Sequence, residues 1–286
     1  MGVNLSGIIR PFYFISLFII SMYTLIITSK DRPAQLEALL SSIEKNAPFF
    51  NTRIIYKASN EEFQKGYDVL RSYGHRAIFL KEKNFREDLS DSLHGRFITF
   101  ATDDGIFFRD LSKEYWEFPF ILDKQTACVS LRLGANTPMN NYYSPNYGQC
   151  YIQQVKHSDG YFNWNHREAA GNFAYPLSVD AHVFRSEVII PLIDKTNFNN
   201  PNSLEANLQR WSSELPPFMA APFKSAYVGN SINRVQDEFQ NYAGGTHGIS
   251  AEELNKKFLD GYRIDWEKFP FDEVKSPHHE FKVYWK

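Results

Sequence analysis

From Tyr23 onward, short apolar runs alternate with longer stretches whose apolar residues recur at helical spacing. The first run is followed by an apolar face with the i, i+3, i+4, i+7 spacing of a helix, and Pro33 suits that helix's first turn. The residues of this face are Leu36, Leu39, Leu40 and Ile43. Strands are predicted at residues 24–28, 53–56, 76–80 and 96–101, and further helices at residues 61–73 and 85–93. This alternation predicts an α/β fold, with helices on both faces of a mainly parallel central sheet.

Beyond Leu111 the pattern is less regular. Residues 136–172 are rich in Asn, Tyr, Gly, Ser and Pro, which predicts long loops of the kind that often carry function. Strand and helix patterns return at residues 175–184, 186–193, 203–215 and 226–235. Because no repeat or linker interrupts the sequence, we expect one domain over residues 23–286, with halves at 23–111 and 112–286.

The N-terminal segment is apolar, and residues 11–29 carry no charge. About 20 apolar residues can span a bilayer, but the end of this run is also the first predicted strand. The remaining residues, 12–22, are too few to span. We interpret residues 1–22 as a dispensable extension or the product of an upstream start. Peripheral membrane contact is the second interpretation and a cleaved signal peptide the third.

Composition narrows the class of protein. Hydrophobic residues make up 43% of the chain and charged residues 22%, which is typical of a globular protein. Lys and Arg (31) nearly balance Asp and Glu (33), so no basic excess points to nucleic acid as a partner. The two cysteines, Cys128 and Cys150, are too few for a disulfide framework, which favours reduced thiols in a cytoplasmic protein.

Polar segments follow three of the predicted strands, beginning at Thr28, at Lys57 and at Asp103. Ligands of such sheets bind beyond the carboxyl ends of the strands. Asp103 and Asp104 are adjacent carboxylates, which repel each other unless a cation or proton lies between them. Oxygen ligands of this kind suit Mg²⁺ or Mn²⁺. The alternative is a solvated turn, since Asp-Asp-Gly is favourable turn chemistry; the convergence of three strand ends favours the metal.

These elements together resemble family-2-like glycosyltransferases with the GT-A fold, the nucleotide-diphospho-sugar transferase type. The matching segments are TLIITSKDRP (24–33), TDDG (102–105), YPLSVD (175–180) and NPNSLE (200–205). The resemblance implies an inverting transfer from a nucleotide-sugar donor to a glycan, lipid-linked or other hydroxyl acceptor, with Mn²⁺ or Mg²⁺ on the diphosphate. It makes residues 23–111 the nucleotide-sugar half and residues 112–286 the acceptor half. In two places the chain departs from the family, with Gly105 where a further acid often stands and Lys57 where an acid often contacts the nucleobase or ribose.

The resemblance also suggests residues that bind the donor. Arg32 lies where it places the nucleotide, although a solvated position in the helix's first turn is an equal alternative. Thr28 and Ser29 either bond the base or ribose or cap the helix. Arg86 either reaches a phosphate or forms a surface salt bridge, the commoner role. His247, in a glycine-rich loop, either completes the metal coordination, as a C-terminal histidine does in many GT-A enzymes, or is merely exposed.

An inverting transfer needs a carboxylate to take the proton of the acceptor hydroxyl. The resemblance places Glu205 in this role, but Glu205 and Asn202 also have the spacing of a capping box. Asp180 is the second candidate. It is predicted to end a strand at residues 175–179 and either binds an acceptor hydroxyl or closes a turn.

Two other functions compete with this hypothesis. A nucleotidyltransferase would share the sheet and the metal, but would usually carry a glycine-rich basic loop after its first strand, and residues 28–33 contain no glycine. A catalytically inactive nucleotide- or sugar-binding protein on the same fold is the other alternative, against which the retained Asp103, Asp104 and Glu205 argue.

Overall fold

The computed structural model describes residues 22–139, 156–158, 160–236 and 243–286. Apart from Met22, the predicted extension at residues 1–22 lies outside this part of the chain, as do Cys150 and part of the predicted loop region. Among the described residues, no helix combines the length and the apolar character needed to cross a membrane.

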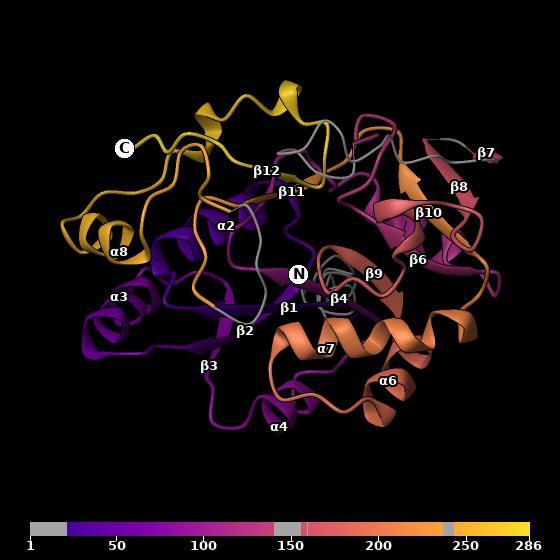
Figure 1. Ribbon diagram of the computed structural model, residues 1–286, viewed down its shortest axis with the longest axis horizontal. Helices are drawn as coiled ribbons and strands as arrows, with labels where there is room; N and C mark the ends of the chain where they lie inside the picture. Colours follow the sequence, from indigo (N-terminus) through magenta and orange to yellow (C-terminus); the bar gives the residue numbers. More distant parts are fainter. Residues whose placement is uncertain (1–21, 140–155, 159, 237–242) are drawn as a thin grey trace, which may run out of the picture.

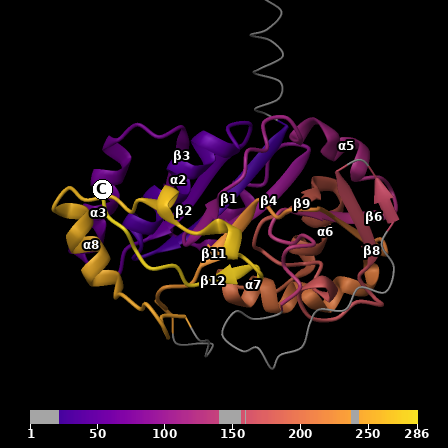
Figure 2. The same ribbon diagram turned by 90° about the horizontal axis from the view of Figure 1, so that it is seen from above.

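A nine-stranded sheet runs through the molecule in the order β3-β2-β1-β4-β9-β6-β10-β8-β7 (Figures 1 and 2). Strands β1 to β4 pair with one another in parallel. Strand β9 runs antiparallel to both of its neighbours, β4 and β6, and β8 runs antiparallel to β10 and β7. Because β10 runs parallel to β6, only β8 and β9 among the described strands run against the other strands of this sheet, and the predicted α/β fold with a mainly parallel sheet is confirmed. The strands are β1 (Tyr23–Lys30), β2 (Asn51–Lys57), β3 (Ala77–Lys81), β4 (Phe97–Thr102), β6 (Thr126–Ser130), β7 (Lys156–Ser158), β8 (Tyr161–Asn165), β9 (His182–Arg185) and β10 (Phe218–Pro222).

Helices cover both faces of this sheet, as predicted. Alternate side chains of β1 point to opposite faces: Leu25 and Ile27 belong to one buried cluster and Ile26 to the other. Helices α2, α3 and α8 contribute to the first cluster, and α4, α6 and α7 to the second (Figure 1). The helices are α2 (Pro33–Asn46), α3 (Glu61–Ser72), α4 (Phe85–Ser90), α5 (Phe118–Ile121), α6 (Ser186–Lys195), α7 (Pro201–Leu208) and α8 (Ala251–Leu259), with 3-10 turns at Tyr115–Glu117, Gly171–Ala174, Gln209–Glu214, Trp266–Lys268 and Phe271–Glu273.

A second, three-stranded sheet lies beside the first, in the order β12-β11-β5. Its strands are β5 (Gly105–Phe107), β11 (Tyr227–Asn230) and β12 (His278–His279). The segment after the two aspartates therefore turns into β5, which pairs with β11. A side chain on Gly105 would collide with Tyr227, whose hydroxyl would lie 1.9 Å from the new Cβ. This contact explains why glycine stands where the resemblance would place an acid.

One predicted element is wrong. Residues 175–181, expected to contain a strand that ends at Asp180, form turns and bends, and the strand begins only at His182. Leu177 and Val179 supplied the apolar signal, but they are buried in the second cluster without joining a strand ladder. Asp180 therefore precedes β9 and does not follow a strand.

Candidate functional site

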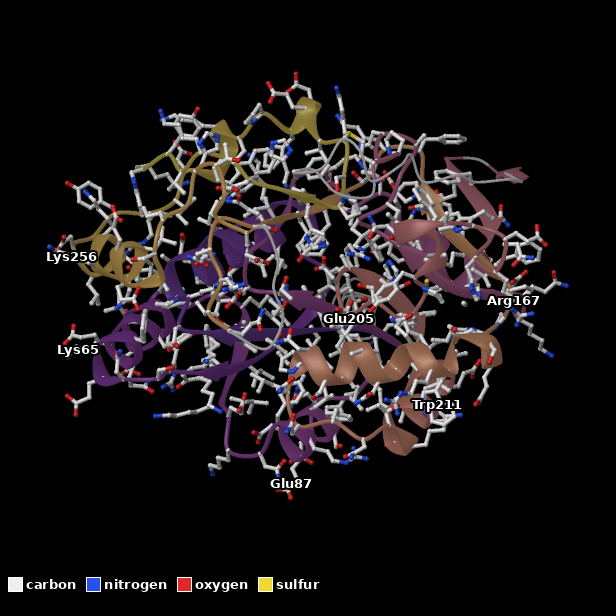
Figure 3. All side chains as sticks on the ribbon, viewed as in Figure 1. Lys65, Glu87, Arg167, Glu205, Trp211 and Lys256 are labelled. Atoms are coloured by element: carbon white, nitrogen blue, oxygen red, sulfur yellow. The ribbon has the colours of Figure 1, made fainter. Side chains whose placement is uncertain are left out.

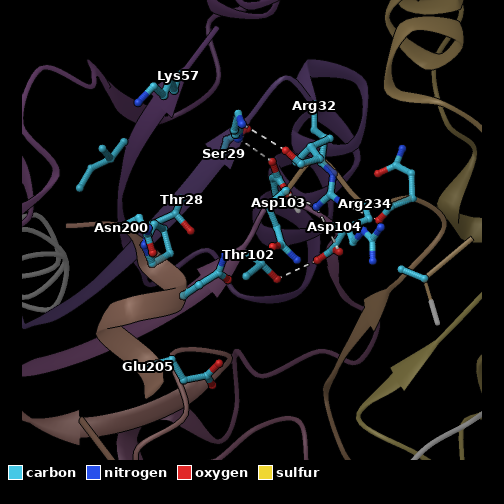
Figure 4. Close-up of a pocket in the computed structure, with 18 of the residues that line it drawn as sticks. Thr28, Ser29, Arg32, Lys57, Thr102, Asp103, Asp104, Asn200, Glu205 and Arg234 are labelled. Atoms are coloured by element: carbon cyan, nitrogen blue, oxygen red, sulfur yellow. Dashed lines mark hydrogen bonds and ion pairs between the residues drawn. The ribbon is translucent and has the colours of Figure 1, made fainter. Parts of the chain in front are cut away.

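A cavity of about 760 Å³ opens at the carboxyl ends of β1, β2 and β4, opposite the start of α7 (Figure 4). The structure brings most of the predicted site residues together here. Those that line the cavity are Thr28, Ser29, Arg32, Lys57, Asp103, Asp104 and Glu205. Asp180, Arg86 and His247 are described by the structure but are not among the lining residues.

The turn after β1 is fixed to the end of β2. Asp31 adopts a positive φ of 57° and is only 6% exposed. Its backbone N–H donates to the carbonyl of Lys57, and its carboxylate accepts the backbone N–H and the hydroxyl of Ser59. Such a strained backbone persists only where its surroundings hold it. The turn therefore sets the position of Arg32, the next residue and the N-cap of α2.

Arg32 lies between the two aspartates. Its Nη1 is 3.0 Å from Oδ1 of Asp103 and 3.4 Å from Oδ2 of Asp104, and its Nη2 donates to the carbonyl of Asn233 at 2.6 Å. The Arg32 side chain is only 10% exposed. The alternative of a solvated arginine is therefore wrong. Helix capping by Thr28 or Ser29 is wrong as well, because the N-cap of α2 is Arg32 and its backbone N–H donates to the hydroxyl of Tyr67.

The two aspartates differ in their surroundings. Asp103 is 3% exposed, and its second oxygen accepts the backbone N–H of Lys30 at 3.1 Å. Burial raises the pKa of Asp103 to about 6, although the guanidinium of Arg32 acts in the opposite direction. Asp104 is less buried, and its Oδ1 accepts the hydroxyl of Thr102 at 2.7 Å. Asp103 thus belongs mainly to the framework, whereas Asp104 presents its carboxylate to the cavity.

The predicted metal site is only partly assembled. No cluster of three or more His, Cys, Asp or Glu side chains that could hold an ion occurs in the described residues. His247 is exposed, and its backbone N–H donates to Glu280. Mg²⁺ and Mn²⁺ commonly bind through one or two carboxylates together with substrate phosphates. Asp104 fits that arrangement, with Asp103 behind it, whereas a ligand role for His247 stays a prediction.

Charged residues also lie at the ends of the next two strands. Lys57, the last residue of β2, pairs through Nζ with Oε1 of Glu82 at 3.0 Å. Glu82 directly follows β3, and its backbone N–H donates to the carbonyl of Tyr56. Both side chains line the cavity. Glu82 was missed in the sequence, although the strand-end rule that selected Lys57 applies equally to it.

Glu205 stands on the opposite wall of the cavity, on α7 (Figure 4). In Figure 3 Glu205 lies near the middle of the view, whereas Lys65 and Glu87 lie at its rim. The N-cap of α7 is Asn200, which accepts the backbone N–H of Ser203 in a capping box. The predicted box of Asn202 and Glu205 is therefore wrong.

Because Glu205 does not cap α7, its carboxylate is available for other hydrogen bonds. Its Oε1 accepts the hydroxyl of Ser178 at 2.8 Å and the backbone N–H of Val179 at 3.2 Å. Glu205 also lines a second cavity, of about 240 Å³, together with Arg132, Gly171, Asn172, Tyr175 and His278. Glu205 and His278 line both cavities, so Glu205 stands where the two meet.

Asp180 lies behind this second cavity. It is 5% exposed, and its Oδ2 is 3.5 Å from Nη1 of Arg132. The next residue, Ala181, has a positive φ of 52° and is held by backbone hydrogen bonds to Phe100 and Leu131. Burial, followed by the charges of Asp180 and Asp104, raises the pKa of the Tyr227 hydroxyl far above its ordinary value. Asp180 thus holds Arg132 in place and is not exposed to a ligand in either cavity.

Arg86 has neither of its predicted roles among the contacts described. Its guanidinium donates to the carbonyls of Thr196 and Asp194 at the end of α6 and lies 4.8 Å from the centre of the Phe198 ring. Carbonyls at a helix C-terminus lack partners within the helix and attract cations. Arg86 therefore ties α4 to α6, and a phosphate contact stays a prediction.

The chain is similar to the bifunctional glycosyltransferase pgtA of Dictyostelium discoideum, with 22% identity over 283 residues that cover 84% of this chain. The predicted resemblance to glycosyltransferases is confirmed. Membership of family 2 stays a prediction, and no protein-family model matches the chain. The chain spans only 36% of the length of pgtA, so the activity of that whole protein is a proposal for this one.

Solved structures give weaker similarities. A mannosyltransferase from Pyrobaculum calidifontis, in complex with GDP-Man and Mn²⁺, is 12% identical with a TM-score of 0.29 and covers 41% of each chain. Mouse xyloside xylosyltransferase 1 is 11% identical with a TM-score of 0.33, covering 68% of this chain and 77% of that one. A mycobacterial protein is 13% identical with a TM-score of 0.38, covering 71% and 65%. At these scores the fold is better described by the chain's own strand order.

Proposed function

We propose that this protein is an inverting glycosyltransferase, which moves a sugar from a nucleotide-diphosphate sugar to an acceptor hydroxyl. One observation carries the proposal: the carboxylate of Glu205 stands where two cavities meet, and the larger cavity has Arg32 and Asp104 at its strand ends. The similarity to a glycosyltransferase over most of the chain supports the same reaction class.

The larger cavity is suited to the donor. Its lining carries Lys30 and Arg234, whose charges attract a diphosphate, while Thr28 and Lys57 lie toward the ends of β1 and β2. A divalent ion, when bound by Asp104 and the phosphates, would neutralise charge that develops on the leaving nucleotide. Arg32 would hold Asp103 and Asp104 together in the absence and in the presence of donor, because its contacts lie within the protein.

Glu205 is the proposed base. Its two hydrogen bonds within the described chain both go to Oε1, so Oε2 is left to take a proton. As the acceptor oxygen bonds to the anomeric carbon, its proton passes to Glu205 and the bond from that carbon to the phosphate oxygen breaks. Attack from the side opposite the leaving group inverts the configuration. Asp180 is the weaker candidate, because it lines neither cavity and is paired with Arg132.

The turn after β1 argues against a nucleotidyltransferase. Such an enzyme cradles phosphates with free backbone N–H groups of a loop. Here the N–H of Lys30 donates to Asp103 and that of Asp31 donates to Lys57. The remaining alternative, an inactive binding protein, is a matter for experiment.

The test is a thermal-shift panel of UDP, GDP, CDP and dTDP with and without Mn²⁺, followed by hydrolysis and transfer assays with donor sugars. We expect one nucleotide to stabilise the protein in a metal-dependent way and Asp104→Asn to abolish that dependence. Glu205→Gln should keep nucleotide binding but slow transfer about 10²–10⁴-fold. Glu187→Gln, a change in an exposed acid on α6, is the matched control and should do neither.

The same experiment separates the alternatives. If no nucleotide stabilises the protein, the transferase hypothesis is wrong. If nucleotides bind but the wild type transfers no sugar, the chain is an inactive binding protein. If Glu205→Gln transfers at the wild-type rate, Asp180 becomes the candidate base.

A further inference from the structure

The smaller cavity has a polar lining that the donor does not explain. Its charged and aromatic residues are Arg132, Tyr175, Glu205 and His278, and its volume is about 240 Å³. Nucleotide-sized ligands are usually bound in cavities of about 300–1,000 Å³. The size therefore suits a single ring, and the shared wall with the larger cavity places such a ring next to Glu205.

Arg132 is the unusual member of this lining. It is only 3% exposed, and its Nε–H lacks an acceptor in the described part of the chain. Its Nη1 lies 3.3 Å from Nε2 of His278 and 3.5 Å from the carboxylate of Asp180. Arginine has no acceptor, so Nε2 of His278 must present its lone pair, which makes His278 the neutral tautomer with hydrogen on Nδ1. An arginine buried with so few good partners is costly unless a ligand completes its hydrogen bonds.

The backbone is shaped to hold this group. His278 lies over Gly229 of β11, where a Cβ would come 2.7 Å from Nδ1 of His278. Asp180 is fixed behind Arg132 by the strained Ala181. Three separate parts of the chain, after β6, before β9 and on β12, thus converge on one small cavity.

The charges indicate what the cavity holds. Arg132 is already opposite Asp180, and Glu205 adds a further negative charge on the shared wall. An anionic ligand would be repelled by Glu205, and a cation by Arg132. Neutral hydroxyls suit both, because each hydroxyl can donate to a carboxylate and accept from a guanidinium.

We propose that the smaller cavity is the acceptor subsite and that it binds one uncharged sugar ring, so the acceptor is a neutral glycoside rather than a phosphate or a sugar acid. This inference rests on the proposed function and extends it by naming the acceptor class. The Nε–H of Arg132 donates to a hydroxyl of the ring, His278 holds the Arg132 guanidinium in place, and Tyr175 lies beside Glu205. Burial, with the charge of Glu205 next, raises the pKa of Tyr175 to about 12, so its hydroxyl stays protonated and able to donate.

The test measures transfer from the donor that the thermal-shift panel identifies. The probes are neutral methyl hexosides and N-acetylhexosaminides, compared with methyl uronides and hexose 6-phosphates. We expect transfer to at least one neutral glycoside and at least ten-fold lower kcat/KM for its charged counterparts. Tyr175→Phe should raise the KM for that glycoside about ten-fold while leaving the Kd of the nucleotide unchanged.

Arg132→Met tests the same subsite, with folding checked by thermal unfolding. Even if this variant does not fold, the Tyr175→Phe variant and the comparison of neutral with charged probes decide whether the smaller cavity is a subsite for a neutral sugar. The inference is overturned if uronides or phosphates are the better acceptors, or if Tyr175→Phe leaves the acceptor KM unchanged. A wild type that binds no nucleotide would instead contradict the proposed function itself, so the two failures are distinguishable.

Discussion

The two halves of the molecule hold their buried polar groups in different ways. In the first half, β2 pairs with β1 and β3, its neighbours in sequence, and the buried charges of Asp103 and Arg32 pair with each other. In the second half, β9 inserts between β4 and β6, and β10 lies between β6 and β8. There the buried groups include neutral histidines, such as His182. Both halves bury an ion pair, because Arg132 faces Asp180 in the second, but the second half in addition depends on keeping a buried histidine unprotonated.

The largest expected effect concerns the ion pair. Arg32→Met should cost about 3–5 kcal/mol of unfolding free energy, because it leaves the buried carboxylate of Asp103 without its cation. Urea unfolding measures this change. Arg86→Met is the matched control and should cost far less, since Arg86 binds carbonyls and is not paired with a buried acid. Equal losses in the two variants would contradict the contrast between paired and unpaired arginines.

A smaller effect on the unfolding free energy, which grows as the pH falls, should distinguish the second half from the first. Burial, with the charge of Arg132 next, lowers the pKa of His182 to about 3 from an ordinary value of 6.5. Below pH 6.5 the unfolded chain binds a proton that the folded chain refuses, so stability should fall as pH drops toward 3, by up to about 1.4 kcal/mol per pH unit. His182→Gln should make this slope shallower, by the part that His182 contributes, whereas the exposed His94→Gln should not. Urea midpoints at pH 7, 6 and 5 provide the measurement. If the midpoints of the wild type and of His182→Gln fall in parallel as the pH is lowered, the role given to His182 is wrong.

The smallest expected effect concerns the start of α7. Asn200→Ala should cost about 1 kcal/mol, because Asn200 caps the helix. Asn202→Ala should change stability by only a few tenths of a kcal/mol. Thermal unfolding of both variants measures the difference. A larger loss of stability for Asn202→Ala than for Asn200→Ala would indicate a capping box of Asn202 and Glu205, and it would weaken the proposed role of Glu205 as a base.

The sequence predicted the first half well because its signals are local. The predicted strand at residues 24–28 lies within β1, and the predicted helix at residues 61–73 differs from α3 by one residue. The convergence of Arg32 and Asp104 followed from the parallel order of the strands. Asp31 was overlooked because its role depends on a backbone angle that residue type does not reveal.

The second half was harder to predict because its elements are defined by distant partners. Pro201 moved the start of α7 so that Asn200, and not Asn202, became the cap. Leu177 and Val179 resembled a strand although they pack without a ladder. Arg132 had a usable signal, as a single charge within an apolar run after β6, but only the fold brings His278 to it.

The collision between Gly105 and Tyr227 has an evolutionary consequence. The two residues are separated by more than a hundred positions, yet Gly105 cannot gain a side chain while Tyr227 is kept. A homologue with an acid at the position of Gly105 should carry a smaller residue at the position of Tyr227. The absence of the motif's extra acid and the presence of a tyrosine on a distant strand would then be coupled features rather than independent ones.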